Sequence, residues 1–454
     1  MCAQKPANPE NSLLTDLYQL TMCAAYFSSK RTELATFDLF VRELPKERAF
    51  LIACGLEQAV DYLLNFRFSD ADLEYLRSTK KFSEDFLAFL KNLRFTGDVY
   101  AVPEGTPVFA REPILRITAP LPEAQIIETF LLNTIGCETL FASKAARVVN
   151  SARGKMCVEF GLRRAHGSDA GMKAARASHI SGFAGTSNVL AGKEFGIPIY
   201  GTVAHSFILS YADEISAFKD YARVFPSECL LLIDTYDTLE GARNAARVGV
   251  ELEKKGFAFK GVRIDSGNLV ELSKEVRKIL DNAGLTHSKI FASGDLDEYK
   301  IEKMLEEGAC IDAFGVGTNL VTSSDAPSLN CNYKLSEIAD SSGANKPVLK
   351  LSSGKATLPG KKQVYRISRE EKFLKDVIAL EEETIDGEPL LIKLIENGKL
   401  AGKLPSLEEI RARVRVQMSS LPESLKTLRK ASAYKVELSK KLSELVKSET
   451  EKHK

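Results

Sequence analysis

Residues 259–318 read FKGVRIDSGNLVELSKEVRKILDNAGLTHSKIFASGDLDEYKIEKMLEEGACIDAFGVGT, and this stretch decides the fold class. Three short β-rich runs in it are predicted strands, at residues 259–264, 289–292 and 311–314. The two segments between them have the apolar spacing of amphipathic helices, at residues 269–283 and 297–307. The strands recur at about 30 residues, the length of a βα unit. This order predicts a parallel sheet covered by helices.

The same order of elements extends toward the N-terminus. Further β-rich runs are predicted as strands at residues 155–160, 196–200 and 229–233, and residues 238–255 are predicted to be helical. Six such units favour a β/α barrel or a near relative of one.

The two ends of the chain have a different pattern. The first third reads as mixed α/β, with a strand at 34–41, a small antiparallel sheet within 97–117, and several amphipathic helices. From about Ser336, β-rich runs return before the chain ends in helices. The helices predicted in the first third span residues 14–25, 56–65, 70–77, 84–93 and 123–135.

Composition bounds the class of protein. The chain has 454 residues, of which 44% are hydrophobic and 27% charged, so large buried cores are expected and global disorder is excluded. Lys and Arg total 62 against 61 Asp and Glu, a net charge of +1. This balance argues against a general nucleic-acid or membrane-surface binder, which needs a basic excess, but it permits a local basic pocket.

Targeting and redox features indicate a cytoplasmic protein. No apolar run reaches the roughly 18 residues of a membrane-spanning helix, and the first twelve residues lack the apolar core of a signal peptide. None of the eight cysteines is spaced as C-x-x-C, which predicts reduced, buried thiols. They are Cys2, Cys23, Cys54, Cys137, Cys157, Cys229, Cys310 and Cys331.

Polar residues follow every predicted strand of the repeated region, where β/α barrels place their active sites. Two of these strand ends are glycine-rich, Ser293-Gly294-Asp295 and Gly315-Val316-Gly317-Thr318. Glycine lets backbone amides approach a phosphate closely, although glycines also serve in tight βα turns. Two such loops on successive strands favour the phosphate interpretation.

Two arginine positions and one histidine add possible chemistry. Arg163 follows the strand that ends at Phe160, where it is either a ligand for an anion or part of a surface patch. Arg263 interrupts an apolar strand, and a buried arginine normally has an anionic partner. His205 follows the run at 196–200, and its imidazole can act as acid, base or nucleophile. The spacing alone leaves a catalytic and a structural role for His205 equally open.

Longer strings resemble the nicotinate phosphoribosyltransferase family over about residues 11–422. They are LLTDLYQLTM (13–22), FGLRRA (160–165), GFAGTSNVLA (182–191), GTVAHSF (201–207), VRIDSG (262–267), FGVGT (314–318) and DAPSL (325–329). The resemblance implies transfer of a phosphoribosyl group from 5-phosphoribosyl 1-diphosphate to nicotinate, coupled to ATP hydrolysis, in NAD biosynthesis.

The resemblance also implies the architecture, that of the type II phosphoribosyltransferases. This is an incomplete β/α barrel, expected at residues 141–335, beside an α/β domain. That second domain is expected to combine residues 1–140 with a C-terminal segment at 336–454. A homodimer with a shared active site is implied.

Site residues are carried over by motif. His205 is expected to be catalytic and phosphorylated by ATP, and Asp265 is a further catalytic candidate for the ribose or metal. The expected nicotinate site comprises Tyr18 (from the partner subunit), Phe160, Arg163, Thr202, Ser187 and Arg263. The expected phosphoribosyl diphosphate site comprises Gly294, Gly315, Gly317 and Thr318. Mg²⁺ is expected with ATP and the diphosphate, without a certain protein ligand.

One position bears on specificity, and the chain departs from the family pattern in two other places. Nicotinamide phosphoribosyltransferases carry aspartate at the Ser187 position, so serine favours the acid substrate over the amide. The family commonly has Gln-Gly-Pro-Asp where this chain has His166-Gly167-Ser168-Asp169. It usually has Asp at the position of Asn268, and the change removes a carboxylate beside the phosphate region.

Other classes fit the sequence less well. A quinolinate phosphoribosyltransferase shares the fold but uses no phosphohistidine, so the GTVAHSF motif argues against it. A barrel lyase or isomerase would normally show a Schiff-base lysine or a clear acid/base pair at strand ends. A non-catalytic scaffold gives no reason to combine His205, Arg263 and two glycine loops.

Overall fold

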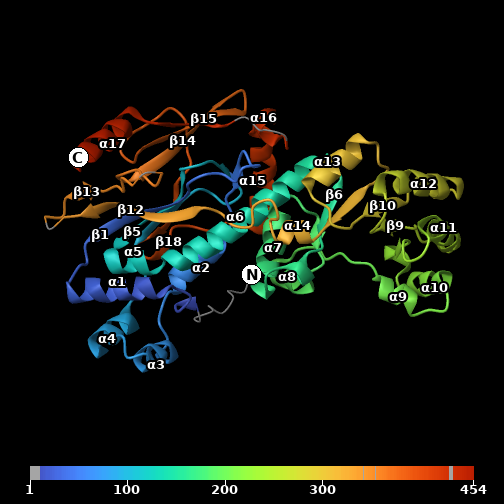
Figure 1. The fold of residues 1–454 in the computed structure, drawn as a ribbon, viewed down its shortest axis with the longest axis horizontal. Coiled ribbons are helices and arrows are strands. Elements are labelled where there is room, and N and C mark those ends of the chain that lie inside the picture. The colour runs from blue at the N-terminus through green and yellow to red at the C-terminus, as the bar shows by residue number, and fades with distance from the viewer. Residues whose placement is uncertain (1–10, 341, 353, 429–432, 454) are drawn as a thin grey trace. The chain divides into compact units, whose positions relative to one another are not determined.

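The computed structural model describes residues 11–340, 342–352, 354–428 and 433–453 (Figure 1). The chain divides into two compact units, one formed by Met1–Leu140 with Ser328–Lys454 and the other by Phe141–Pro327. The second boundary therefore lies before the position expected from the sequence, residue 335. The reason is that strand β12 (Cys331–Ala339) pairs along its length with β1 (Leu34–Val41) of the first unit.

The first unit is built on a seven-stranded antiparallel sheet that mixes strands from both ends of the chain. Its order is β13 (Asn345–Pro347), β12, β1, β5 (Pro113–Pro120), β3 (Asp98–Ala101), β17 (Ile392–Glu396) and β18 (Lys399–Leu400). The small antiparallel sheet expected within 97–117 is thus part of a larger one, because β5 pairs with β1 and β3 with β17.

Two smaller sheets complete the β-structure described for this unit. One has the order β16 (Glu388–Pro389), β14 (Lys362–Arg369), β15 (Lys372–Leu380) and β19 (Lys435–Leu438). The other pairs β2 (Leu51–Ile52) with β4 (Pro107–Val108).

The helices of the first unit largely follow the sequence pattern. Helix α1 starts where Asp16 and Gln19 form a capping box, three residues later than expected from the apolar spacing. The helix expected at 123–135 is two helices, α5 and α6, and α6 continues to Ser151 in the second unit. The helices are α1 (Leu17–Ser28), α2 (Leu56–Asn65), α3 (Asp70–Ser78), α4 (Glu84–Asn92), α5 (Leu121–Ile126), α6 (Glu128–Ser151), α15 (Leu407–Ser420), α16 (Glu423–Lys426) and α17 (Lys440–Glu451).

The second unit contains a six-stranded sheet in which every pair is parallel. Its order is β7 (Gly185–Thr186), β6 (Met156–Glu159), β11 (Ala313–Val316), β10 (Lys289–Ala292), β9 (Gly261–Ile264) and β8 (Leu230–Leu232). Leu231, Val262 and Ile290 are fully buried in these strands, as expected for a parallel sheet covered by helices.

Helices follow most strands of this sheet, and α10, α11 and α12 pack side by side near β9 (Figure 1). The helices are α7 (Ser168–Ile180), α8 (Val189–Phe195), α9 (His205–Leu209), α10 (Glu214–Val224), α11 (Thr238–Lys254), α12 (Leu269–Asn282), α13 (Glu298–Glu306) and α14 (Thr318–Val321). Within the described residues, the edge strands β7 and β8 do not pair, so the barrel is incomplete and the predicted fold class is confirmed.

One predicted strand is wrong. Residues 196–200 form a single bridge, from Ile199 to Thr186, rather than a strand. The sixth strand is instead β7, whose two residues carry no apolar pattern. A Cβ at Gly185 would lie 2.1 Å from the Pro198 oxygen, so glycine is needed for the close approach of this segment.

Among the described residues, the seven cysteines form no disulfide bond; Cys23, Cys54, Cys157 and Cys229 are buried. Cys137, Cys310 and Cys331 are partly exposed, and Cys2 lies outside the described residues. No described helix combines the length and the apolar character needed to cross a membrane.

Candidate functional site

The parallel sheet brings most of the predicted site residues to one edge. Because all six strands run in the same direction, the segments that follow them meet at their carboxyl ends. Residues expected from the sequence at this edge are Phe160 after β6, Ser187 after β7, Asp265 after β9, Gly294 after β10, and Gly317 and Thr318 after β11. Arg163 lies on the exposed turn after β6.

Arg263 lies on β9 with its side chain mostly buried. Its Nη1 donates a hydrogen bond to Thr202 Oγ1 at 2.7 Å, and its Nη2 is 3.9 Å from Asp265 Oδ1. Burial lowers the pKa of Arg263, whereas the carboxylates of Asp265 and Asp234 raise it. Its Nε is buried and has no hydrogen-bond partner in the described part of the chain. The structure therefore joins Arg263 to Thr202 and leaves a buried donor that an anion could satisfy.

Asp234, which follows β8, organises the neighbouring loops and was not among the expected site residues. Its Oδ2 accepts hydrogen bonds from Asp265 N at 3.0 Å and Ser266 Oγ at 2.6 Å. Its Oδ1 is buried and unpaired within the described residues. Ser293 Oγ in turn donates to Asp265 Oδ1. Hydrogen bonds thus connect the loops after β8, β9 and β10. The sequence signal for Asp234 was its position at a strand end.

His205 is the first residue of α9, and its side chain is partly exposed. Its Nδ1 lies 3.1 Å from Thr235 Oγ1, in the loop after β8. When Nδ1–H donates to this hydroxyl, the lone pair of the ring lies on Nε2, which is then the nucleophilic nitrogen. The geometry suits a phosphoryl acceptor at Nε2.

Phe160 stacks on Phe291 with ring centroids 5.6 Å apart. Gly315 lies against both rings and leaves room for them because it has no side chain. A Cβ at Gly315 would lie 2.6 Å from the ring of Phe160. Glu159, also missed by the sequence reasoning, accepts hydrogen bonds from Gly161 N and Thr186 Oγ1. Its burial raises the pKa of its carboxyl group. Ser187 N also donates to the backbone carbonyl oxygen of Glu159 at 2.8 Å. Glu159 therefore connects the loops after β6 and β7 through both its side chain and its backbone.

The loop after β10 has the features of an anion cradle. Gly294 and Asp295 both have positive φ, +101° and +47°. A Cβ at Gly294 would lie 2.1 Å from the Asp265 oxygen, so only glycine fits. In the part of the chain that the structure describes, the backbone N–H groups of Gly294, Asp295 and Leu296 donate no hydrogen bond. Successive unpaired amides in a turn form a site for a phosphate.

We expect Gly294→Ala to destabilise the chain by about 2 kcal/mol or more, because the new Cβ meets the Asp265 backbone in addition to the unfavourable φ. The matched control is Gly284→Ala, since Gly284 has a φ of +82° but no atom within 4 Å of a Cβ. That control is expected to lose only about 1 kcal/mol. Urea unfolding of the two variants measures the difference, and equal losses would contradict the close contact.

The unusual Asn268 has a structural explanation. It is the N-cap of α12, and its side chain accepts a hydrogen bond from Glu271 N at 3.4 Å. Asparagine and aspartate are about equally good N-caps, so the loss of the carboxylate preserves the helix start. The chain also differs from the family pattern at residues 166–169. There Gly167 has a φ of +99°, and Ser168 is the first residue of α7.

Two further features lie within the first unit. Tyr18, on α1, is half-exposed, and its hydroxyl accepts a hydrogen bond from Gln19 Nε2 at 2.9 Å. Burial, followed by the charge of Glu128, raises the pKa of Tyr18 to about 12.

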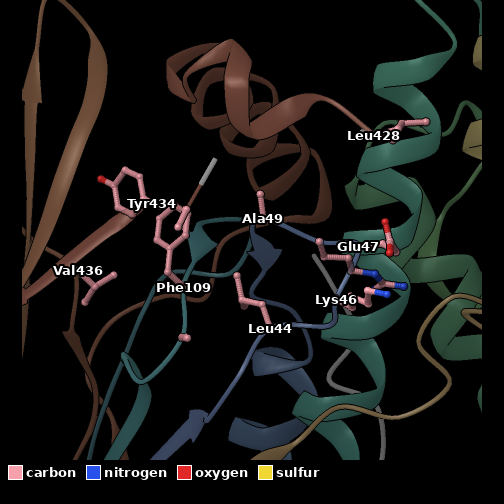
Figure 2. Close-up of a pocket in the computed structure, with 11 residues that line it drawn as sticks. Leu44, Lys46, Glu47, Ala49, Phe109, Leu428, Tyr434 and Val436 are labelled. Carbon is pink, nitrogen blue, oxygen red and sulfur yellow. The ribbon is translucent and has the colours of Figure 1, made fainter. Parts of the chain in front are cut away.

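The second feature is a cavity of about 390 Å³. Phe109 and Tyr434 stack at one end of it, 3.7 Å between centroids, and Lys46 and Glu47 lie at the other end (Figure 2). None of the expected site residues lines this cavity.

Comparison with known proteins places the whole chain in one family. The model described as the nicotinate phosphoribosyltransferase N-terminal domain matches residues 13–136, the family model matches 156–364, and the C-terminal domain model matches 385–446. A nicotinate phosphoribosyltransferase of Mycobacterium tuberculosis is 46% identical over 92% of this chain and 89% of its own length. The chain belongs to the nicotinate phosphoribosyltransferase family.

Other relatives agree. The nicotinate phosphoribosyltransferase of Bacillus subtilis is 43% identical over 94% of this chain and 93% of its own. The crystal structure of the human nicotinic acid phosphoribosyltransferase matches with a TM-score of 0.85 at 31% identity, covering 96% of this chain and 99% of the human one. The fold of this nicotinate phosphoribosyltransferase family member is therefore shared along the full length of the solved relative.

Proposed function

We propose that this chain is an ATP-coupled nicotinate phosphoribosyltransferase. It joins nicotinate to 5-phosphoribosyl 1-diphosphate and releases diphosphate and nicotinate mononucleotide, a precursor of NAD. The observation that carries the proposal is the mostly buried Arg263. Its Nη1 donates a hydrogen bond to Thr202, and its Nε is unpaired within the described residues. The unpaired backbone amides of residues 294–296 lie at the same edge of the sheet. One feature suits a carboxylate and the other a phosphate.

The transfer replaces one bond at C1 of the ribose by another. The bond from C1 to the diphosphate oxygen breaks as the pyridine nitrogen bonds to C1, and the diphosphate leaves with the electron pair. Such a step through an oxocarbenium-like state depends on positioning and charge stabilisation. Arg263 and Thr202 hold the nicotinate carboxylate, Phe160 stacks on the ring, and the amides of residues 294–296 bind phosphate oxygens.

The carboxylates at the strand ends fit a magnesium ion. Asp234 has an unpaired, buried Oδ1, and Asp265 lies next to it in the hydrogen-bond network. Carboxylate oxygens together with phosphate oxygens are the ligands that Mg²⁺ prefers. Bound there, Mg²⁺ would supply neutralisation of the charge on the departing diphosphate.

His205 couples the reaction to ATP. Its Nε2 forms a bond to the γ-phosphorus as the bond from that phosphorus to the β–γ bridging oxygen breaks, and ADP leaves. Water later cleaves the phosphohistidine to phosphate and histidine. The Thr235 hydroxyl supports this role because it engages Nδ1 and leaves Nε2 available.

Ser187 selects the acid over the amide. We expect Ser187→Asp to raise the nicotinate KM about tenfold or more, because a carboxylate about 4 Å from the substrate carboxylate costs roughly 1–4 kcal/mol. Ser187→Asn, which is neutral and of similar size to aspartate, serves as the control and should change the KM much less. Steady-state kinetics with both variants measures the effect, and equal KM values would contradict the charge argument.

A homodimer with a shared site accompanies this proposal. Tyr18 is expected to reach the site of the partner subunit. Leu14, Leu17 and Tyr18 are each about half exposed, which supports a surface covered by another subunit. Light scattering of the purified chain measures its mass in solution.

A substrate panel tests the proposed function. Nicotinate, nicotinamide and quinolinate are each incubated with 5-phosphoribosyl 1-diphosphate, Mg²⁺ and ATP, and the nucleotide products are identified by mass. Nicotinate is expected to be the preferred substrate by at least tenfold. Preference for nicotinamide or quinolinate would contradict the proposed substrate.

A further inference from the structure

Asn319 connects the two glycine-rich loops. It lies on α14 directly after Thr318, and its side chain reaches the loop that follows β10. Its Nδ2 donates to the Asp295 oxygen at 3.0 Å and to the Leu296 oxygen at 3.3 Å. Because only the nitrogen of the amide can donate to two carbonyl oxygens, this orientation of the side chain is fixed.

The loop after β10 is held from its other side as well. Ser293 N donates to the Ile264 oxygen at 2.9 Å, and Ser293 Oγ donates to Asp265. Gly294 packs directly against the Asp265 backbone. The loop after β10 therefore lies between the loop after β9 and helix α14. The hydrogen bonds from the Asn319 side chain join this loop to α14.

Asn319 holds a peptide group whose N–H belongs to the proposed phosphate site. Asp295 has a left-handed backbone, which a residue with a side chain seldom adopts unless its surroundings hold it. The Asp295 carbonyl and the Leu296 N–H belong to one planar trans peptide and point in opposite directions. Holding the carbonyl on Asn319 thus fixes the direction of the Leu296 N–H, which is unpaired within the described residues.

A second side chain reaches the same carbonyl without linking the loops. Lys300 Nζ donates to the Asp295 oxygen at 2.7 Å. Lys300 belongs to α13, the helix into which this loop runs, so its bond stays within one βα segment. Lys300 therefore offers a matched comparison for Asn319.

We propose that Asn319 is a positioning residue for 5-phosphoribosyl 1-diphosphate. It sets the separation of the loops after β10 and β11, so that their backbone amides converge on one phosphate group. Asn319 itself does not bind the substrate. This inference rests on the proposed function, because it needs a phosphate at these loops.

Kinetics of Asn319→Ala test the proposal. The loss of two hydrogen bonds is expected to raise the KM for 5-phosphoribosyl 1-diphosphate about fivefold to tenfold, with kcat and the nicotinate KM within about twofold of wild type. Asn319→Asp keeps the shape but places an acceptor against two carbonyl oxygens, so its KM should rise more than that of the alanine variant. Lys300→Met removes one hydrogen bond to the Asp295 oxygen but keeps the link between the two loops, so its KM should rise clearly less than that of Asn319→Ala.

The outcomes distinguish a failure of the proposed function from a failure of the role proposed for Asn319. A wild-type chain that forms no nicotinate mononucleotide overturns the proposed function. An active wild type with an unchanged KM for 5-phosphoribosyl 1-diphosphate in Asn319→Ala overturns this inference alone. It is also overturned if Lys300→Met has the same effect as Asn319→Ala, or if Asn319→Ala lowers the melting temperature and changes all kinetic constants together.

Discussion

Replacement of His205 by alanine is expected to abolish labelling of the chain by ATP that carries a labelled γ-phosphate. The reason is that the proposed phosphate acceptor is the ring nitrogen Nε2 of His205, whose Nδ1 lies 3.1 Å from the Thr235 hydroxyl. Slow transfer without ATP should remain, because Arg263 and the glycine loops are intact in this variant. Acid-labile label on the purified protein and product formation without ATP are the two measurements.

The matched control is His287→Ala. His287 lies in the same compact unit, is half-exposed, and pairs with Glu253 at 2.8 Å, outside the strand-end loops. This variant should be labelled like the wild type. Undiminished labelling of His205→Ala would show that phosphate resides elsewhere and would remove the proposed ATP coupling from this residue.

Replacement of Arg263 by alanine is expected to raise the nicotinate KM about 100-fold. A charge-assisted hydrogen bond contributes about 1.5–3 kcal/mol, and the variant loses the whole guanidinium fork along with its bond to Thr202. The KM for 5-phosphoribosyl 1-diphosphate should change much less, because the loop amides remain. Steady-state rates with each substrate varied in turn separate the two effects.

Arg277→Ala controls for the loss of a structural arginine. Arg277 has a similar side-chain exposure, 19% against 14% for Arg263, and it bonds Asp281 and the Ser288 oxygen. Its loss should lower the melting temperature and leave the nicotinate KM unchanged. An unchanged nicotinate KM in Arg263→Ala would contradict the assignment of the carboxylate site.

The repeated part of the fold was predictable because its elements have strong local patterns. The strand at 289–292 has the predicted bounds, and α11 and α12 each end one residue before the predicted position. The strand predicted at 196–200 is wrong because this apolar run forms only a single bridge, from Ile199 to Thr186. The true edge strand, β7, has only two residues and cannot show an alternating pattern.

The sequence predicted which residues of the candidate site follow the strands. It did not predict the hydrogen bonds that connect one loop to another. Arg263 was expected to need an anionic partner, yet its bond to Thr202 spans 61 positions of the chain. Asp234 and Asn319 act through hydrogen bonds to loops 31 and 24 residues away. Such pairs leave no local spacing in the sequence, so only the folded arrangement shows them.

The measurement that tests the central claim most directly is the initial rate of nicotinate mononucleotide formation from nicotinate and 5-phosphoribosyl 1-diphosphate, with and without ATP in one preparation. Product is expected in both reactions, with a several-fold higher rate and ADP release when ATP is present. No nicotinate mononucleotide under either condition would contradict the account, and an equal rate without ADP release would contradict its ATP coupling.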